Sequence, residues 1–429
     1  MPCTAYAQGA PDWTAVQAEA VKTIQAYVRI DTSNPPGDVT KAAEFLSGIF
    51  DREGIPVKRY ESAPGRTILV ARLRGRGAAK PILLLNHMDV VPTDPARWSH
   101  DPFAAEIADG RIWGRGTIDM KGLGVVQLMA FLSLKRQNVP LDRDVIFMAV
   151  PDEEVGGGLG AEWMLKNHFS DLDPEFILDE GGLGSRDLFA AGKLVFGISV
   201  AEKKLIWLKL RAVGVSGHGS QPNDQNPNDH LTRALARMLS EPLPTSPFSV
   251  LETMKSRVGP LAANKFNNAI QHSTISITTL RSGVGDPPKV NVIPSVAEAT
   301  LDCRVLPGTT TEQWVAEIRR RLADPSIEIE IINEGADPTV TAQDSSFYRA
   351  LESAVKRKHP EAIVTPMVVP YTTDSNKYRP RGVKAYGFTP VIVPAAAVAS
   401  MHGDAEFLPI DAIGPAIEIL FEALKETAG

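Results

Sequence analysis

The sequence contains little cysteine: only Cys3 and Cys303 occur in 429 residues. Two cysteines cannot form a disulfide framework or a thiolate metal site, so any bound metal must be held by histidine and carboxylate side chains. The sequence also lacks a run of about 18 apolar residues, the minimum for a membrane-spanning helix. We therefore expect no membrane association.

The chain has no excess of positive charge either. Its formal net charge is −6, its pI is near 5.8, and its lysines and arginines are scattered. These features exclude a nucleic-acid-binding surface. The apolar fraction of 43% and the charged fraction of 22% are typical of a globular protein. The length indicates two or three domains.

The first residues do not form a targeting segment. Ala5-Tyr6-Ala7 resembles the cleavage site of an export signal, but no apolar stretch precedes it. As written, the sequence predicts a cytoplasmic protein. A periplasmic or secreted location is expected if an export signal preceded residue 1.

The stretch 82–89 reads Ile-Leu-Leu-Leu-Asn-His-Met-Asp, an apolar run that ends in a histidine and an aspartate. Such a run, bounded by glycine and proline, predicts a parallel strand covered on both faces. Side chains alternate along a strand, so His87 and Asp89 point the same way. Asp89 could then accept one N–H of His87 and leave the other nitrogen for a metal. The alternative is a core histidine paired with an acid.

The same pattern recurs twice. An apolar strand at 145–150 is followed by Asp152-Glu153-Glu154, and another at 176–178 is followed by Asp179-Glu180. Strands that alternate with helices predict a mostly parallel α/β sheet, where ligands bind beyond the carboxyl ends of the strands. Asp119 precedes a helix expected over 123–137. We therefore expect these side chains to gather at one edge of the sheet.

The middle of the chain has a different character. Strands and helices from 204 to 334 form a β-α-β-β-α-β pattern of the size of a small domain. We interpret residues 204–334 as an insertion, and residues 1–203 and 335–429 as one catalytic domain.

The candidate residues suit two zinc ions that share one carboxylate. His87 and His402 would lie at the outside, Asp119 would form the bridge, and Glu154 with an acid of Asp179-Glu180 would complete the set. Glu153 is adjacent to a ligand, where a general base for a metal-bound water would lie. Each residue alone also has an ordinary structural explanation, such as a helix cap or a surface loop residue. Their coincidence at strand ends favours the metal site.

The sequence resembles the dinuclear-zinc hydrolases that include aminoacylases, carboxypeptidase S, acetylornithine deacetylase and succinyl-diaminopimelate desuccinylase. It is most similar to the aminoacylase and carboxypeptidase S branch. The motifs that carry the resemblance are 86–92 (NHMDVVP), 98–103 (WSHDPF), 114–122 (GRGTIDMKG), 152–157 (DEEVGG), 178–181 (LDEG), 216–220 (SGHGS), 291–294 (NVIP) and Thr373-Asp374.

The resemblance implies specific roles at the metal site. His87, Asp119, Glu154 and His402 correspond to metal ligands, Glu153 to the base, and Asp89 to the residue behind His87. Both Asp179 and Glu180 fit the remaining ligand position, and we favour Glu180. Two zinc ions per subunit are implied, with cobalt or manganese as possible substitutes.

The resemblance also implies that the insertion is an α+β, ferredoxin-like lid through which the protein forms a homodimer. His218 would donate to the scissile carbonyl oxygen, often across the dimer, while Asn291 and Arg304 would hold the substrate. An arginine fork suits a free carboxylate. We expect Arg304 to face the cleft without a fixed acidic partner; the alternative is a pair with Asp302.

Together these features predict a metal-dependent hydrolase of small molecules, cleaving N-acyl amino acids or short peptides next to a free carboxylate. The alternative enzyme is a carboxypeptidase or dipeptidase that acts on peptides only. The alternative from another class is a catalytically silent binding protein. Filled ligand positions argue against the silent protein. The acyl group, the side-chain preference and the native metal stay open.

Overall fold

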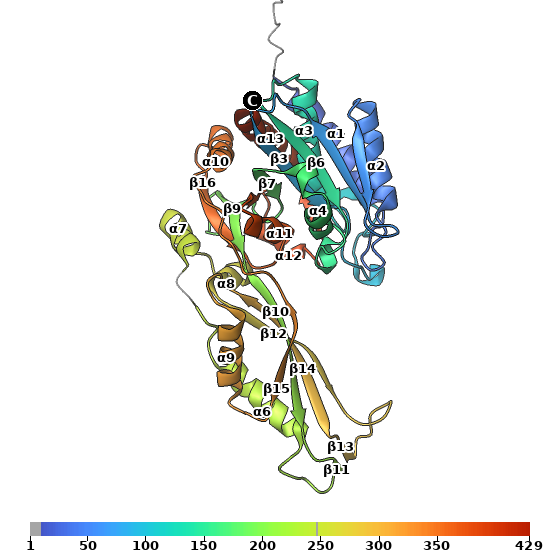
Figure 1. The fold of residues 1–429 in the computed structure, drawn as a ribbon, viewed down its shortest axis with the longest axis vertical. Helices are drawn as coiled ribbons and strands as arrows, with labels where there is room; N and C mark the ends of the chain where they lie inside the picture. The colour runs from blue at the N-terminus through green and yellow to red at the C-terminus, as the bar shows by residue number, and fades with distance from the viewer. Residues whose placement is uncertain (1–9, 246–247) are drawn as a thin grey trace, which may run out of the picture.

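The backbone forms a large rounded body from which an elongated arm projects (Figure 1). The computed structural model describes residues 10–245 and 248–429. Cys3 and the stretch 5–7 lie outside the described residues. We call the large sheet with its covering helices the body, and the four-stranded sheet with α6 and α9 the arm.

The body is built on a sheet of nine strands. Eight follow the order β1-β2-β6-β3-β7-β17-β9-β16, and β8 pairs with β9. The pairs β3/β6, β3/β7, β7/β17 and β9/β16 are parallel, so the expected mostly parallel sheet is confirmed. The strands are β1 (Val57–Glu61), β2 (Thr67–Leu73), β3 (Ala79–His87), β6 (Arg143–Val150), β7 (Phe176–Asp179), β8 (Gly184–Ser185), β9 (Val195–Glu202), β16 (Ile363–Val369) and β17 (Lys384–Gly387).

Helices cover both faces of this sheet, which explains the continuous apolar run in β3. Leu84 packs into the core on one face, while Leu83 and Leu85 pack into the core on the other. The first face carries α1 (Trp13–Val28), α2 (Thr40–Arg52), α3 (Lys121–Arg136), α10 (Ser346–Lys358) and α13 (Ile413–Ala428). The second carries α4 (Ala161–Asn167), α5 (Phe169–Leu172) and α11 (Ser375–Tyr378).

Side-chain caps fix where several helices begin. The Asp12 carboxylate accepts hydrogen bonds from the first turn of α1, and Ser345 caps α10. In the arm, Thr310 and Gln313 form a capping box at the start of α9. Such caps satisfy backbone N–H groups that have no partner within the helix.

The arm contains a four-stranded antiparallel sheet in the order β12-β14-β10-β15. Along β14, side chains alternate between buried and half-buried because helices cover one face only. The expected β-α-β-β-α-β unit is confirmed. Its elements are β10 (Lys204–Val213), α6 (Pro227–Ser240), β12 (Thr274–Ser282), β14 (Val296–Val305), α9 (Thr311–Leu322) and β15 (Glu328–Glu334); β11 (Gly217–His218) pairs with β13 (Val292–Ile293) at its far end (Figure 1).

One segment within the expected insertion packs elsewhere. Helices α7 (Ser249–Val258) and α8 (Lys265–Gln271) direct apolar side chains such as Met254 and Ile270 into the core of the body. The arm has a separate core. An apolar helix face in the sequence shows that the helix is buried but not which sheet it covers, so the pattern could not reveal this return to the body.

The remaining elements are short. A small sheet combines β18 with β5 and β4. No helix within the described ranges has the length and hydropathy needed to cross a membrane. These elements are β4 (Glu106–Ala108), β5 (Arg111–Trp113), α12 (Ala395–Ser400), β18 (Phe407–Pro409) and the 3₁₀ turns Pro95–Arg97, Glu153–Val155, Arg379–Arg381 and Ile410–Ala412.

Candidate metal centre

Three neighbouring parallel strands bring the candidate residues together. His87 is the last residue of β3, which lies between β6 and β7. Glu153 and Glu154 follow β6, and Asp179 ends β7. The expected convergence at the carboxyl edge of the sheet is therefore confirmed.

Asp119 lies between two histidines that are far apart in the sequence. His87 Nε2 is 3.0 Å from Asp119 Oδ1, and His402 Nε2 is 3.0 Å from Asp119 Oδ2. Each carboxylate oxygen thus faces a different imidazole. A carboxylate that bridges two cations needs this arrangement.

Two glutamates flank this trio. Glu154 Oε2 is 3.2 Å from His402 Nε2, and Glu180 Oε1 is 3.8 Å from His87 Nε2. Potential ligand atoms lie within 4.8 Å of one another in two groups, His87 with Asp119 and Glu154, and His87 with Glu153 and Glu180. The cluster therefore offers two histidines and several acids at metal-binding spacing.

The two acids at the carboxyl end of β7 have different surroundings. Asp179 Oδ2 accepts hydrogen bonds from Ser375 N at 2.9 Å and Ser375 Oγ at 2.8 Å. Its Oδ1 accepts from Glu180 N at 2.8 Å. Both oxygens of Asp179 are occupied by protein donors, whereas the Glu180 carboxylate faces the cluster. The geometry favours Glu180 as the ligand.

A backbone carbonyl, not a carboxylate, is the nearest partner of His87 Nδ1. The Asp89 carbonyl oxygen lies 2.9 Å from Nδ1, and the Asp89 carboxylate is more distant, at 3.6 Å. A carbonyl can only accept, so Nδ1 carries the proton and Nε2 is directed at Asp119. The fixed tautomer was expected, but its nearest partner is a different group of Asp89.

The Asp89 carboxylate instead holds the Glu153-Glu154 pair. It accepts hydrogen bonds from the backbone N–H groups of Glu153 at 3.2 Å and Glu154 at 3.3 Å. Asn34 Nδ2 also donates to it, at 2.8 Å. Sequence reasoning missed Asn34, because nothing in the sequence around it indicates a contact with Asp89, 55 positions away.

A buried ion pair joins the loops that carry Asp119 and His402. Arg115 Nη1 donates to Glu406 Oε2 at 2.7 Å and Nη2 donates to the Gly403 carbonyl at 2.8 Å. Glu406 Oε1 also accepts from Asp119 N at 3.1 Å. Glu406 is fully buried. Its position in the 400–406 stretch beside His402 was the available signal, but sequence reasoning assigned it no role.

The electrostatics of the cluster favour an added cation. Burial raises the pKa of Glu153 and Glu180 well above the usual range of a glutamate. Burial acts in the same direction on Asp119, but hydrogen bonds from His402 and His87 outweigh it and leave the pKa of Asp119 well below its usual value. Hydrogen bonds to Asp119 and Glu154 raise the pKa of His402 to about 10. Acids crowded in a buried site are stabilised in their charged form by a bound cation.

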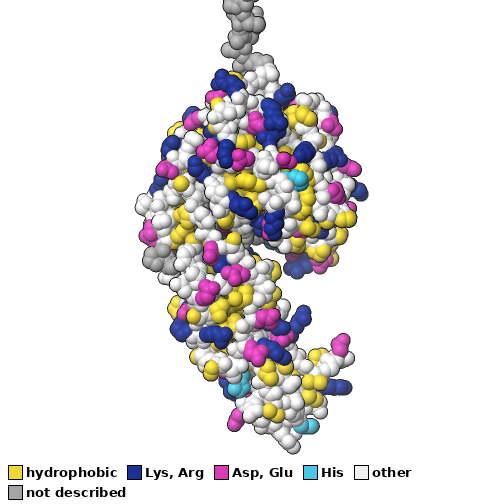
Figure 2. Space-filling view, in the orientation of Figure 1, with side chains coloured by type: hydrophobic (Ala, Val, Ile, Leu, Met, Phe, Trp, Pro, Cys, Tyr) yellow, Lys and Arg dark blue, Asp and Glu magenta, His cyan; other side chains and the backbone are white. Residues whose placement is uncertain are grey.

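The cluster lies between two lobes of a cleft. One lobe has a volume of about 610 Å³ and is lined by basic, acidic and other polar residues together with several apolar ones; we call it the polar lobe. The other has a volume of about 760 Å³ and is lined mostly by apolar residues; we call it the apolar lobe. Both are lined by Glu153, Glu154, Arg304, Tyr371, Thr372 and His402. Figure 2 shows a notch where the body meets the arm.

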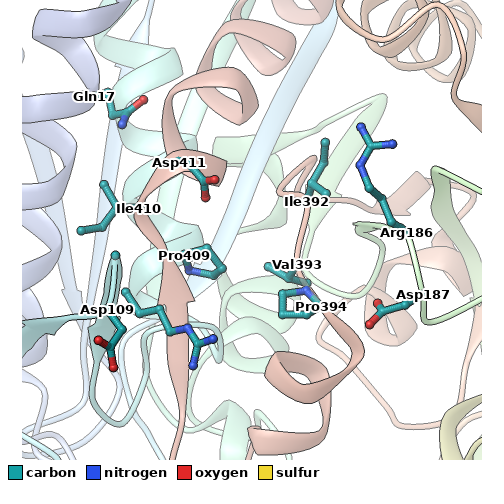
Figure 3. A pocket seen from close by; sticks show the side chains of 12 residues that line it. Gln17, Asp109, Arg186, Asp187, Ile392, Val393, Pro394, Pro409, Ile410 and Asp411 are labelled. Carbon is teal, nitrogen blue, oxygen red and sulfur yellow. The ribbon is translucent and has the colours of Figure 1, made fainter. Parts of the chain in front are cut away.

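A separate hollow lies away from this cluster. Its volume is about 720 Å³, and it is bounded by Gln17 of α1, the turn 109–111 and the segments 392–394 and 409–411. Figure 3 shows Arg186 and Asp187 at one side of it and Asp109 at the other. None of the expected site residues lines it.

Arg304 has a fixed acidic partner, so the expectation of an unpaired arginine is wrong. Its Nε donates to Asp302 Oδ1 at 2.7 Å and its Nη2 to Asp302 Oδ2 at 3.1 Å. These two residues face the same side of β14 because they are two positions apart. Arg304 Nη1 points to Thr372 Oγ1, 3.3 Å away. The side chain therefore spans from the arm to the body at the mouth of both lobes.

His218 and Asn291 do not reach the cluster of their own chain. His218 is the last residue of β11 and Asn291 directly precedes β13, at the end of the arm that is remote from the body (Figure 1). His218 Nδ1 accepts a hydrogen bond from Ser220 N at 3.1 Å, and the Asn291 carbonyl accepts from Gly219 N at 2.7 Å. Neither residue lines the two lobes.

Comparison with known proteins gives the family. Residues 83–426 match the model of peptidase family M20/M25/M40. The chain belongs to this family. A relative, probable carboxypeptidase S-like 2 of Dictyostelium discoideum, is 30% identical over 81% of this chain and 72% of its own. Aminoacylase-1 of Mus musculus is 29% identical over 87% of each chain.

Solved M20 structures have the same fold. The M20 family metallo-carboxypeptidase Sso-CP2 from Sulfolobus solfataricus superimposes with a TM-score of 0.72 at 20% identity, covering 95% of this chain and 98% of that chain. Human carnosine dipeptidase 1 gives 0.70 at 16% identity, covering 96% and 97%. M20 membership implies a divalent metal, and the nitrogen and oxygen donors around Asp119 fit one.

Proposed function

We propose that this M20 hydrolase cleaves the amide bond of N-acyl amino acids or short peptides next to a free carboxylate, using two zinc ions. The observation that carries the proposal is the position of Asp119, whose two oxygens lie 3.0 Å from His87 Nε2 and 3.0 Å from His402 Nε2. His87 and Glu180 would hold one ion, and His402 and Glu154 the other. Cobalt or manganese could replace zinc in a site of this donor type.

The chain's own residues would handle the proton. When bound, the cations would polarise the scissile carbonyl and lower the pKa of water, so that water can lose a proton and attack the carbonyl carbon. Glu153 would accept the proton of the attacking water as the C–O bond forms, and would pass it to the nitrogen as the C–N bond breaks. No protein hydrogen bond to the Glu153 carboxylate is found within the described residues, so the group is available for this role.

The polar lobe supports recognition of the carboxylate. Lys377 and Arg381 line it, and neither lies within ion-pair distance of an acid in the described part of the chain. Arg304 is held by Asp302, which leaves its Nη1 edge facing Thr372. A fixed guanidinium with two further basic side chains in the same lobe suits an anionic group on the substrate.

We also propose that residues 204–334, with the arm as their main part, act as a lid through which two chains pair. His218 and Asn291 lie at the remote end of the arm, so a role for them in catalysis requires the site of a second copy. His218 accepts at Nδ1 and therefore carries its proton on Nε2, which can donate to a substrate carbonyl.

The experiment is a substrate panel with metal removal. N-acetyl amino acids, dipeptides and their carboxyl-amidated forms are incubated with zinc-loaded protein, with chelated protein and with chelated protein to which zinc is returned. We expect hydrolysis that is lost on chelation, restored by zinc and weak for amidated substrates. Hydrolysis of dipeptides alone would favour the carboxypeptidase or dipeptidase alternative, and no hydrolysis with zinc, cobalt or manganese would favour a silent binding protein.

A further inference from the structure

The apolar lobe starts at the proposed metal ligands and extends between α8 and α12. At its inner end lie Asp119, Glu180 and His402, where the scissile carbonyl of a substrate must sit. Away from these residues the lining becomes apolar. That part of the wall consists mainly of Leu188, Phe266, Ala396, Val398, Ala399 and Met401.

One wall of the lobe is held in place by two amide side chains, of which that of Asn267 is fully buried. Asn264 Nδ2 donates to the Leu188 carbonyl at 2.6 Å, and Asn267 Nδ2 donates to the same carbonyl at 2.7 Å. Phe266 packs edge-on against the buried ring of Phe189, with centroids 6.1 Å apart. The positions of Leu188 and Phe266 are therefore fixed before any substrate arrives, which lowers the entropic cost of binding.

The opposite wall is open because α12 carries small residues. Ala396 and Ala399 are both exposed, and they share one face of the helix because they are three positions apart. Ala397 packs into the core of the body instead, and Val398 belongs to that core as well as to the wall of the lobe. A larger side chain at 396 or 399 would occupy the lobe without disturbing that core.

The two lobes differ in their charged lining. Arg304 borders both lobes, and the polar lobe adds Lys377 and Arg381, which suit the carboxylate of the amino-acid half. The polar lobe also contains the acids Glu162, Glu334 and Asp374. Beyond Arg304, the apolar lobe has one further basic side chain, Lys265, which is exposed. Burying apolar groups against this lining is favourable.

We propose that the apolar lobe binds the acyl half of the substrate and selects apolar acyl groups longer than acetyl. This inference rests on the proposed function, because it assumes that an acyl amino acid is positioned over Asp119. Each methylene that enters the lobe should increase kcat/KM by about two- to fourfold, the usual gain for apolar burial.

The test uses one amino acid with acyl groups of increasing length. N-acetyl-, N-butanoyl- and N-hexanoyl-alanine are compared with zinc-loaded wild type, Ala396→Phe and Ala399→Leu. In wild type we expect kcat/KM to rise by at least about 15-fold from acetyl to hexanoyl, four methylenes at the rate above. Either variant should lower kcat/KM for N-hexanoyl-alanine by about 10-fold, because the larger side chain occupies part of the lobe. The kcat/KM for N-acetyl-alanine should change by less than about twofold.

The matched control is Ala263→Phe. Ala263 is exposed and precedes Asn264 in the chain, but Ala263 itself lines neither lobe. It should leave the acyl-length dependence unchanged. A second readout does not depend on turnover: the Kd of each N-acyl-alanine is measured by calorimetry in Glu153→Gln protein. The Kd should decrease as the chain lengthens.

The outcomes separate this inference from the proposed function. If wild type hydrolyses N-acetyl-alanine but its kcat/KM does not change with acyl length, the inference is overturned and the proposed function stands. A Kd that does not change with acyl length has the same meaning. If Kd decreases as the acyl chain lengthens but wild type hydrolyses none of the substrates, binding of the acyl group in the apolar lobe is supported and the proposed function is overturned. If Ala396→Phe changes the preference among N-acetyl-alanine and N-acetyl-leucine instead, the lobe binds the amino-acid half and the inference is overturned.

Discussion

Glu153 and Glu154 are adjacent in the chain, but they have different neighbours. Glu154 Oε2 lies 3.2 Å from His402 Nε2, and its Oε1 accepts from Val91 N at 3.2 Å. Glu153→Gln should lower kcat by about 100- to 10,000-fold, as expected for loss of a general base, and retain metal. Glu154→Gln should lose metal. Metal content after gel filtration and steady-state kinetics measure both, and the reverse order would contradict the assignment.

At the same scale, Lys203 predicts a pH dependence of stability. Burial lowers its pKa from 10.5 to about 7, while its Nζ donates to the Ala269 carbonyl and Thr274 Oγ1. Between these values the unfolded chain binds more protons than the folded chain, so stability rises with pH. Lys203→Met removes this contribution.

Urea unfolding of chelated protein from pH 7.5 to pH 9.5 measures this contribution. The free energy of unfolding of wild type relative to Lys203→Met should increase by up to about 1.4 kcal/mol per pH unit, the value for one proton. A difference that does not change with pH would show that Lys203 titrates alike in both states.

Residue types and their spacing in the sequence predicted the cluster, but contact partners were less predictable. His87, Asp119 and His402 could be grouped because each follows or precedes a recognisable element. The choice of the Asp89 carbonyl over its carboxylate depends on a local backbone path. The Arg304–Asp302 pair depends on which of several nearby acids is in reach. Tertiary packing decides which of several available hydrogen-bond acceptors a side chain contacts.

At the scale of elements, the loops 114–119 and 402–406 act as one unit because Glu406 binds both. Glu406→Gln would remove the buried partner of Arg115 and weaken the hydrogen bond to Asp119 N. Outer partners of ligands usually contribute about 10- to 100-fold to metal affinity. We therefore expect zinc affinity, measured by chelator competition, to fall by that factor.

The control for this prediction is Glu298→Gln, which removes the charge of a half-exposed ion pair with Lys209 on the arm. Exposed pairs contribute about 0–1 kcal/mol, so stability and zinc affinity should barely change. Equal losses in both variants would show that the effect of Glu406 is not specific to the metal site.

Helices and strands were predicted well where a hydrophobic pattern in the sequence is consistent with one structure alone. The apolar run of β3 and the alternating strands of the arm fall in this class. Helices α7 and α8 do not, because a buried helix face does not specify its partner. Their return to the body could not be read from 204–334 alone.

At the scale of the whole molecule, the remote position of His218 gives a complementation test. If His218 serves the site of a second chain, mixing His218→Ala with Glu153→Gln protein should restore activity, since a hybrid dimer contains one intact site. Random exchange between equal amounts of the two variants makes about half of the dimers hybrids. Each hybrid has one intact site of two, so the expected activity is roughly a quarter of that of wild type. Mass spectrometry confirms exchange, and no recovery after exchange would contradict action across the dimer.

The path of the chain between body and arm has a mechanical consequence. It crosses at Lys203, between α6 and α7, between α8 and β12, and after β15. Phe266 lies on α8, on the body side of these crossings, whereas Arg304 lies on the arm side. If the arm pivoted, Arg304 would move relative to Asp119, whereas the part of the apolar lobe formed by Leu188, Phe266 and α12 would stay in place. The proposed selection of acyl length would then not depend on the position of the arm, whereas the proposed binding of the carboxylate would.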